Sequence, residues 1–170
     1  KKLAAGSDAI LLDVTMGDGA FMKDLDGALE LARQMVAIGT AHGRKVAALI
    51  TDMDKPLGYN IGNSLEVAES MTVLQGKGPV DLTEVCLQLA SNMLVLAGKG
   101  DMPTCRKLAE SVIADGSAFE KCCQMFAAQG GDIRVLDDYS LFAKPAASYE
   151  LLAEQDGYIL QNDAEKIGSA

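Results

Sequence analysis

The stretch that decides the fold is AILLDVTMGDGAF, residues 9–21. Its first six residues form a short apolar run, which predicts a buried strand. The glycines at positions 17 and 19 predict a tight turn directly after that strand, where a backbone can cradle an anion or a ring. The turn lacks the third glycine of a dinucleotide-binding fingerprint and the Lys-Ser/Thr pair of a P-loop. A plain turn is therefore favoured over a nucleotide phosphate site.

The sequence after this turn predicts a helix and then a second strand. Apolar residues recur every three or four positions from Leu25 to Val36, which is typical of an amphipathic helix ending near Gly39 or Gly43. The apolar run KVAALIT, residues 45–51, predicts another buried strand. A strand, a helix and a strand in this order form a crossover between parallel strands. We expect an α/β fold with a partly parallel sheet flanked by helices.

The rest of the chain is expected to be mostly helical before it changes character near the C-terminus. A loop containing Pro56 and Gly58 follows the second strand. Helices are predicted at residues 62–74, from Asp81 onward with its carboxylate capping the first turn, at 103–114 and at 117–128. Short strands are predicted at residues 147–152 and 157–161, beyond a candidate domain boundary at Lys144 and Pro145.

Composition and charge exclude several classes of protein. The 170 residues are 49% hydrophobic and 23% charged, as in ordinary soluble globular proteins. The formal net charge of -9 argues against a nucleic-acid partner, because such binding needs Lys and Arg to neutralise phosphates. The longest apolar runs are far shorter than the roughly 20 residues that cross a bilayer. Without a secretion signal at its start, the chain is expected to be cytoplasmic, with free cysteines.

The candidate chemical groups are few, and each has a structural interpretation. The single histidine, His42, is expected to be structural, because no serine of the nucleophile-elbow type accompanies it. Glu66 and Glu69 lie on one helix face and are usually solvated in such a pair. Backbone carbonyls near Leu57 and Asn60 could combine with these carboxylates to bind a hard cation. Spacing alone leaves both interpretations open.

Seven segments together carry a resemblance to a known family. They are KKLAAGSDAILLDV, GDGAFM, TDMDKPLGY, IGNSLEV, GPVDLTEVCLQLAS, MFAAQGGD and DGYI. In order and spacing they resemble the pyrimidine-nucleoside phosphorylase and thymidine phosphorylase family. This resemblance implies a homodimer whose small helical domain and larger α/β domain enclose the nucleoside and phosphate sites. It assigns residues 1–6 to the end of the helical domain, 7–144 to the central part of the α/β domain, and 145–170 to the start of a C-terminal α+β segment.

The resemblance also implies a reaction and places some of its residues here. The parent enzyme would convert a pyrimidine nucleoside and phosphate into free base and pentose 1-phosphate. Lys1 matches the lysine that contacts the base and stabilises it as it departs. Phe21 matches an aromatic wall of the base pocket, and residues 17–20 match a loop that approaches the other domain on closure. The remaining base-binding and phosphate-binding residues of relatives lie upstream, so the chain alone is expected to be inactive.

A potassium site is implied by the same resemblance. Leu57 and Asn60 match positions whose backbone carbonyls bind the ion, and Glu69 matches its carboxylate ligand. Relatives often have Ala at the position of Asn60 and usually Lys at the position of Thr15. Two alternatives remain open at this stage: an anthranilate-phosphoribosyltransferase-like enzyme with the same fold, and a non-catalytic α/β fragment.

Overall fold

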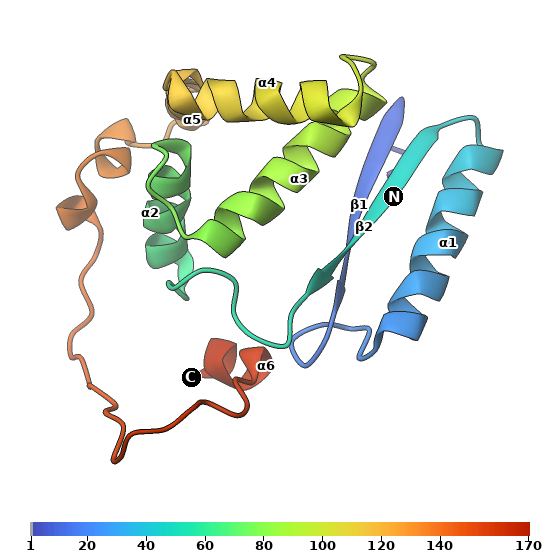
Figure 1. The fold of residues 1–170 in the computed structure, drawn as a ribbon. Coiled ribbons are helices and arrows are strands. Elements are labelled where there is room, and N and C mark those ends of the chain that lie inside the picture. Colours follow the sequence, from blue (N-terminus) through green and yellow to red (C-terminus); the bar gives the residue numbers. More distant parts are fainter. Residues whose placement is uncertain (1) are drawn as a thin grey trace.

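The computed structural model describes residues 2–170 (Figure 1). Two parallel strands, β1 (Ala9–Met16) and β2 (Lys45–Asp52), pair from end to end, with Ala9 opposite Lys45 and Met16 opposite Asp52. Each strand extends slightly beyond its predicted apolar run, so Thr15 continues β1 and lies opposite Thr51. The expected α/β class and the expected parallel pairing are confirmed.

Helix α1 (Leu25–Ala41) makes the crossover between the two strands. Asp24 caps it, because its carboxylate accepts a hydrogen bond of 2.8 Å from the Gly27 N–H. The core at this face contains fully buried Ala28, together with Ala32 and Val14. These small side chains let the helix approach the strands closely.

Helix α3 (Val80–Leu96) covers the other face of the strands and joins them to a helical layer (Figure 1). The remaining helices are α2 (Asn63–Leu74), α4 (Met102–Ala114), α5 (Ser117–Ala128), the 3-10 helices η1 (Ile133–Leu136) and η2 (Tyr139–Leu141), and α6 (Ala164–Ser169). Helix α3 packs against α4, and α4 packs against α5. Each predicted helix is present, with starts that differ by about one residue, as helix ends usually do.

Arg106 of α4 links this helix to α3 through the carboxylate of Glu84, and it also pairs with Glu110 of its own helix. Both terminal nitrogens of Arg106 donate to Glu84 on α3, at 2.9 Å and 2.6 Å, and its Nε donates to Glu110 at 2.6 Å. Hydrogen bonding to Arg106 lowers the pKa of Glu84 to about 2. This bidentate geometry fixes the two helices in register at the surface.

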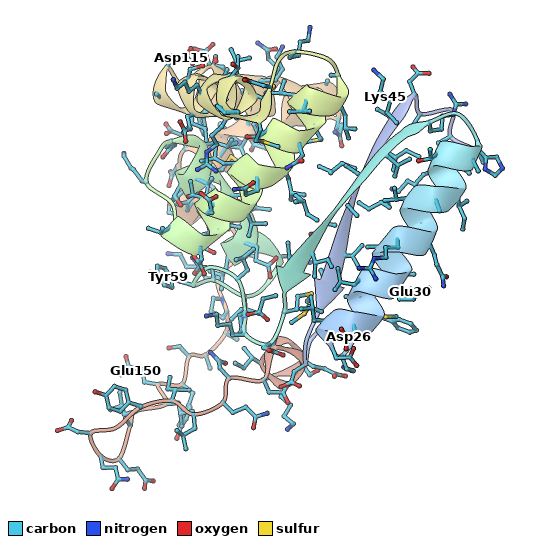
Figure 2. All side chains as sticks on the ribbon, turned by 45° about the vertical axis from the view of Figure 1, so that its right-hand side comes forward. Asp26, Glu30, Lys45, Tyr59, Asp115 and Glu150 are labelled. Atoms are coloured by element: carbon cyan, nitrogen blue, oxygen red, sulfur yellow. The ribbon has the colours of Figure 1, made fainter. Side chains whose placement is uncertain are left out.

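The two strands expected near the C-terminus were predicted wrongly. Residues 142–163 contain neither helix nor strand, and their apolar side chains lie in solvent, among them Leu151, Tyr158 and Leu160. Figure 2 shows this segment, with Glu150 labelled, extending away from the rest of the molecule. A strand needs a partner for its N–H and C=O groups, and within the described residues the segment pairs with no other strand. The three domain boundaries stay predictions.

Candidate functional site

Two loops lie together at the carboxyl ends of the parallel strands. The first loop, residues 17–23, follows β1, and the second loop, residues 53–62, follows β2. The Gly19 N–H donates to the Met53 carbonyl at 2.9 Å, which joins the two loops directly. Binding sites of α/β proteins usually form at this edge of a parallel sheet. The loops are therefore the first place to look for a site.

The first loop is a turn built around the carboxylate of Asp54. The Asp18 N–H donates to Asp54 Oδ1 at 2.9 Å, and Gly17 has a φ of 116°, with no room for a side chain beside Asp54. The backbone of this loop is thus occupied by a carboxylate of the same chain, in agreement with the prediction of a plain turn over a phosphate site. Phe21, the predicted base-pocket residue, lies in the same loop with 91% of its surface exposed.

The second loop wraps around the carboxylate of Glu69. The Tyr59 N–H donates to Glu69 Oε1 at 3.0 Å and to Oε2 at 3.3 Å. The Asn60 N–H donates to Oε2 at 3.3 Å, while its side-chain Nδ2 donates to Oε1 at 3.0 Å. Tyr59 itself lies on the outside of this loop (Figure 2). Asn60 and Glu69, which were predicted to share a cation site, are thus in direct contact, while the cation site itself stays a prediction.

Burial makes Glu69 unusual among the carboxylates of this molecule. Only 4% of its surface is exposed, and within residues 2–170 no Lys, Arg or His nitrogen forms an ion pair with it. Its hydrogen-bond donors are all neutral amides, so they stabilise the charge without neutralising it. Glu66 is different, because it is exposed and accepts from the Gly62 N–H at the start of α2. The two glutamates therefore have separate roles.

The second loop also offers oxygen atoms that could hold a cation beside Glu69. In the described part of the chain, the carbonyl oxygens of Leu57 and Asn60 accept no hydrogen bond. Carbonyl and carboxylate oxygens are the ligands of hard cations, and a buried unpaired charge favours such an ion. No group of three or more His, Cys, Asp or Glu side chains lies within metal-binding reach in residues 2–170. Any ion here would depend on backbone oxygens.

Two further residues build the second loop and were missed as site residues. Gly58 has a φ of 73°, and a side chain there would clash with Glu69 Oε2. Its N–H donates to Asp81 Oδ2 at 3.2 Å, and Asp81 also accepts from the Leu82 N–H at 2.9 Å. The backbone hydrogen bonds from Leu82 and Gly58 lower the pKa of Asp81. Asp81 was predicted to cap the first turn of α3, but Pro79 occupies the cap position and no side chain makes a cap hydrogen bond. The Asp81 carboxylate instead holds the loop, a contact with no sequence signal because 23 positions separate the partners.

The C-terminal segment returns to both loops. The Ala164 N–H donates to the Asp54 carbonyl at 3.3 Å, and the Gln161 side chain donates to Asp18 Oδ2 at 3.3 Å. Lys23 and Glu165 form an exposed ion pair at 3.8 Å. A cavity of about 490 Å³ lies between this segment and the two loops. Helix α6 therefore borders the same edge of the sheet.

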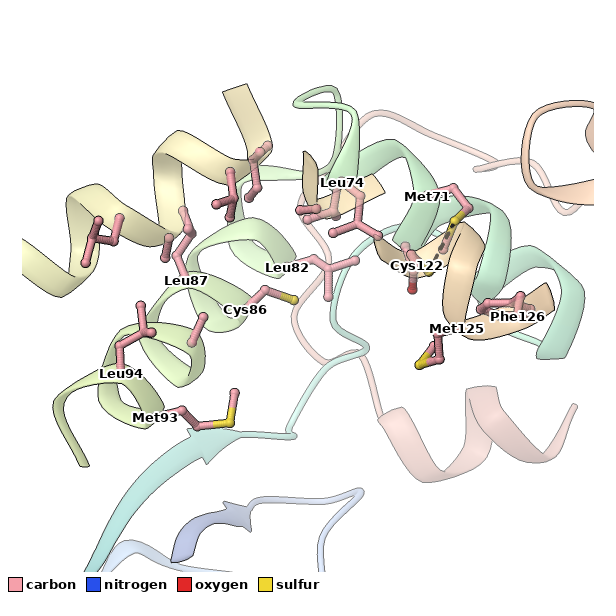
Figure 3. A pocket seen from close by; sticks show the side chains of 18 of the residues that line it. Met71, Leu74, Leu82, Cys86, Leu87, Met93, Leu94, Cys122, Met125 and Phe126 are labelled. Carbon is pink, nitrogen blue, oxygen red and sulfur yellow. Dashed lines mark hydrogen bonds between the residues drawn. The ribbon is translucent and has the colours of Figure 1, made fainter. Parts of the chain in front are cut away.

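A larger cavity lies elsewhere in the described chain. It has a volume of about 970 Å³ and is lined by α2, α3, α4 and α5 (Figure 3). Its walls are almost wholly apolar, and the sulfur atoms of Cys122 and Met71 lie 3.9 Å apart there. None of the predicted site residues lines it. A cavity with so few polar groups suits neither phosphate nor a nucleobase, so we do not assign the site to it.

Three sequence predictions concern residues outside the two loops. Lys1, the predicted catalytic residue, falls outside the described residues, so its role stays a prediction. His42 ends α1 and its Nδ1 lies 2.8 Å from the Ile38 carbonyl, as expected of a structural residue. The four cysteines are free, as expected. Within residues 2–170, none of the helices has the length and apolar character that crossing a bilayer requires.

Comparison with known proteins gives a consistent result over the whole chain. The family described as glycosyl transferase family, a/b domain, matches residues 1–119. A pyrimidine-nucleoside phosphorylase of Geobacillus stearothermophilus is 48% identical over 171 aligned positions, and one of Bacillus subtilis (strain 168) is 46% identical. The same enzyme of Staphylococcus haemolyticus (strain JCSC1435) is also 46% identical. These alignments cover 100% of this chain but only 40% of each relative.

Proposed function

Because the chain belongs to the glycosyl transferase family, as a piece of its a/b domain, we propose that the whole protein is a pyrimidine-nucleoside phosphorylase. The observation that carries this proposal is the identity of 44–48% to relatives of that name along the entire chain. The chain spans 40% of the length of those relatives. The activity is therefore proposed for the whole protein, and the chain alone is expected to be inactive.

The proposed reaction is a transfer of a pentosyl group to phosphate. An oxygen of inorganic phosphate forms a bond to the anomeric carbon, and the bond from that carbon to the ring nitrogen of the base breaks. The bonding electrons leave with the base, which then takes up a proton. The protein has to orient the two substrates and stabilise the negative charge that develops on the base.

This chain would contribute one side of the nucleoside site. Lys1 would place its ammonium group beside the departing base, where a positive charge acts most strongly in the transition state. Phe21, exposed on the first loop, would cover the base once the upstream part of the protein closes over it. The support for this arrangement is the position of both loops at the carboxyl ends of β1 and β2.

A bound potassium ion would complete the second loop. We propose that the carbonyl oxygens of Leu57 and Asn60 and the carboxylate of Glu69 hold it. The ion would neutralise a buried charge and fix the backbone between β2 and α2. The buried and unpaired state of Glu69 supports this assignment. A homodimer, a cytoplasmic location, and the lack of nucleic-acid or membrane partners also belong to the proposal.

The test is phosphorolysis by the full-length protein and by its Lys1→Ala variant. We expect release of uracil or thymine from uridine, thymidine or deoxyuridine, strictly dependent on inorganic phosphate and measured by chromatography. Replacing Lys1 by Ala should lower kcat by about a hundredfold or more, because it removes one group that stabilises the transition state. The second variant Phe21→Ala should raise KM for the nucleoside more than it lowers kcat.

Two outcomes would contradict the proposal. Base release from none of the three nucleosides would exclude the activity. Turnover of anthranilate with phosphoribosyl pyrophosphate instead would assign the protein to the other enzyme that shares the expected fold. Near-normal turnover by the Lys1→Ala variant would remove Lys1 from the mechanism while leaving the activity in place.

A further inference from the structure

We propose that the side-chain amide of Asn60 competes with a cation for the carboxylate of Glu69, and thereby sets how tightly this protein binds potassium. The inference rests on the cation site of the proposed function. It concerns one contact of this chain, the hydrogen bond of 3.0 Å from Asn60 Nδ2 to Glu69 Oε1.

The Glu69 carboxylate already has a nearly complete set of donors. A carboxylate offers about four lone-pair positions. The Tyr59 N–H bridges both oxygens, the Asn60 N–H takes a position on Oε2, and Asn60 Nδ2 takes one on Oε1. A cation that binds this carboxylate must therefore displace one of these N–H donors or occupy the remaining lone-pair position next to one.

Only one of these donors can leave without moving the backbone. The two N–H groups belong to the second loop, which is held in place by the bond from Gly58 to Asp81. The Gly58 main chain also closes the space beside Oε2, because even a methyl group there would clash with that oxygen. Asn60 Nδ2 is different, since rotation about side-chain bonds moves it away from Oε1. The approach of an ion is thus controlled at the Asn60 side chain.

The amide and the ion stabilise Glu69 in different ways. The Nδ2 hydrogens carry partial positive charge, so they satisfy Oε1 but repel a cation that approaches the same oxygen. A neutral amide leaves the buried negative charge in place, whereas an ion neutralises it. Asn60 therefore holds the loop together at low potassium concentration and is displaced as the concentration rises.

The experiment measures thermal unfolding of the full-length protein across a potassium titration. Choline chloride keeps the ionic strength constant, and the potassium concentration at half of the maximal Tm increase is compared among variants. For Asn60→Ala we expect a lower Tm in choline alone and a half-saturating concentration roughly tenfold lower than in the wild type, the size expected from losing one hydrogen bond to a charged group. Asn63→Ala is the matched control, because Asn63 is an exposed asparagine at the start of α2 that does not bond to Glu69.

Two more variants keep the proposal testable. Asn60→Asp has nearly the same shape but replaces the competing donor by an oxygen ligand, so its half-saturating concentration should fall further than that of Asn60→Ala. Glu69→Gln should lose the potassium response. Equal half-saturating concentrations in the wild type, Asn60→Ala and Asn60→Asp would overturn this inference, while a shared potassium response would leave the cation site standing.

Failure of the underlying proposal gives a different result. If neither the wild type nor the Asn60 variants respond to potassium, the cation site is wrong, and this inference fails with it. The phosphorylase activity is judged separately, by base release from nucleosides in the presence of phosphate. Failure of the Asn60 inference, failure of the cation site and failure of the phosphorylase activity therefore give different results.

Discussion

The two loops at the carboxyl ends of the strands use the same construction around different carboxylates. In the first loop, Gly17 has a positive φ and touches Asp54, which accepts the next N–H along the chain. In the second, Gly58 has a positive φ and touches Glu69, which accepts the next two N–H groups. In both cases a glycine lets the backbone approach a carboxylate more closely than any side chain would allow.

The difference between the loops is the burial of the carboxylate. Asp54 is exposed, so water can take the place of its protein partners, whereas Glu69 is buried and the hydrogen bonds of its carboxylate come from the loop. Removing a buried hydrogen-bonded charge leaves its partners unsatisfied, but removing an exposed one does not. The similar local geometry of the two loops therefore does not indicate how much each contributes to stability. The burial of the carboxylate does.

The largest expected effect is that of Glu69→Ala compared with Asp54→Ala. We expect Glu69→Ala to lower the free energy of unfolding by about 2–5 kcal/mol, because it leaves the N–H groups of Tyr59 and Asn60 without a partner. Asp54→Ala should cost about 1 kcal/mol, because water satisfies the Asp18 N–H. Urea unfolding followed by circular dichroism measures both. Equal losses of unfolding free energy in the two variants would show that burial of the carboxylate does not make the two loops differ in stability.

An intermediate effect is expected for substitution of the two loop glycines. Their energetic coupling to the neighbouring carboxylate should differ between the two loops. Gly58→Ala and Gly17→Ala should each cost about 2–3 kcal/mol, because the positive φ and the close contact both disfavour a side chain. The three atoms nearest to a side chain at Gly58 all belong to the Glu69 side chain, so Gly58→Ala should cost about 1 kcal/mol less in a Glu69→Ala background.

The matching cycle at the first loop is the control. A side chain at Gly17 would meet the backbone nitrogen of Asp54 as well as its carboxylate. Removing the Asp54 side chain therefore leaves the obstruction in place, and Gly17→Ala should cost the same with or without Asp54→Ala. Strong coupling between Gly17→Ala and Asp54→Ala would contradict this expectation. So would the absence of coupling between Gly58→Ala and Glu69→Ala.

The smallest expected effect concerns the anchor of the second loop and its pH dependence. Hydrogen bonds from Leu82 and Gly58 lower the pKa of Asp81 below its ordinary value of 3.8. A lowered pKa in the folded state contributes stability above the unfolded-state value, and this contribution is lost as the pH falls from about 4 through the folded-state pKa. Because Asp81 is exposed, the contribution should be about 0.5 kcal/mol or less.

The variant Asp81→Asn tests this contribution. Its free energy of unfolding should change less steeply than that of the wild type below pH 4, and the two should differ by a constant amount between pH 5 and 7. A wild-type slope that is unaffected by the substitution would show that Asp81 does not respond to its two N–H donors. Denaturant unfolding at a series of pH values gives the comparison.

The sequence was sufficient to predict the elements around the site. Apolar runs predicted β1 and β2, and periodic apolar residues predicted α1, because burial of one face leaves a regular pattern. The same reasoning was wrong for residues 147–152 and 157–161, where apolar residues are present but the described chain offers no partner strand. Strand propensity is local, whereas strand formation requires a neighbour.

The candidate site could be predicted only in part. Resemblance grouped Leu57, Asn60 and Glu69, and the structure brings Asn60 and Glu69 into direct contact. Neither pattern nor resemblance indicated that the Asn60 side chain donates to this carboxylate, because that contact depends on the path of the loop. The bond from Gly58 to Asp81 was equally hidden, since it joins two elements across 23 positions.

The sequential packing of α3 on α4 and of α4 on α5 has a consequence for how the chain folds. Neighbours in sequence meet after closing only short loops, which costs little chain entropy, so this helical layer should form rapidly. The pairing of β1 with β2 spans a whole crossover and must wait for α1. During synthesis β1 and β2 leave the ribosome before the helices that follow them. We nevertheless expect the strands to become stably ordered only after the later helices have folded and α3 can pack against them.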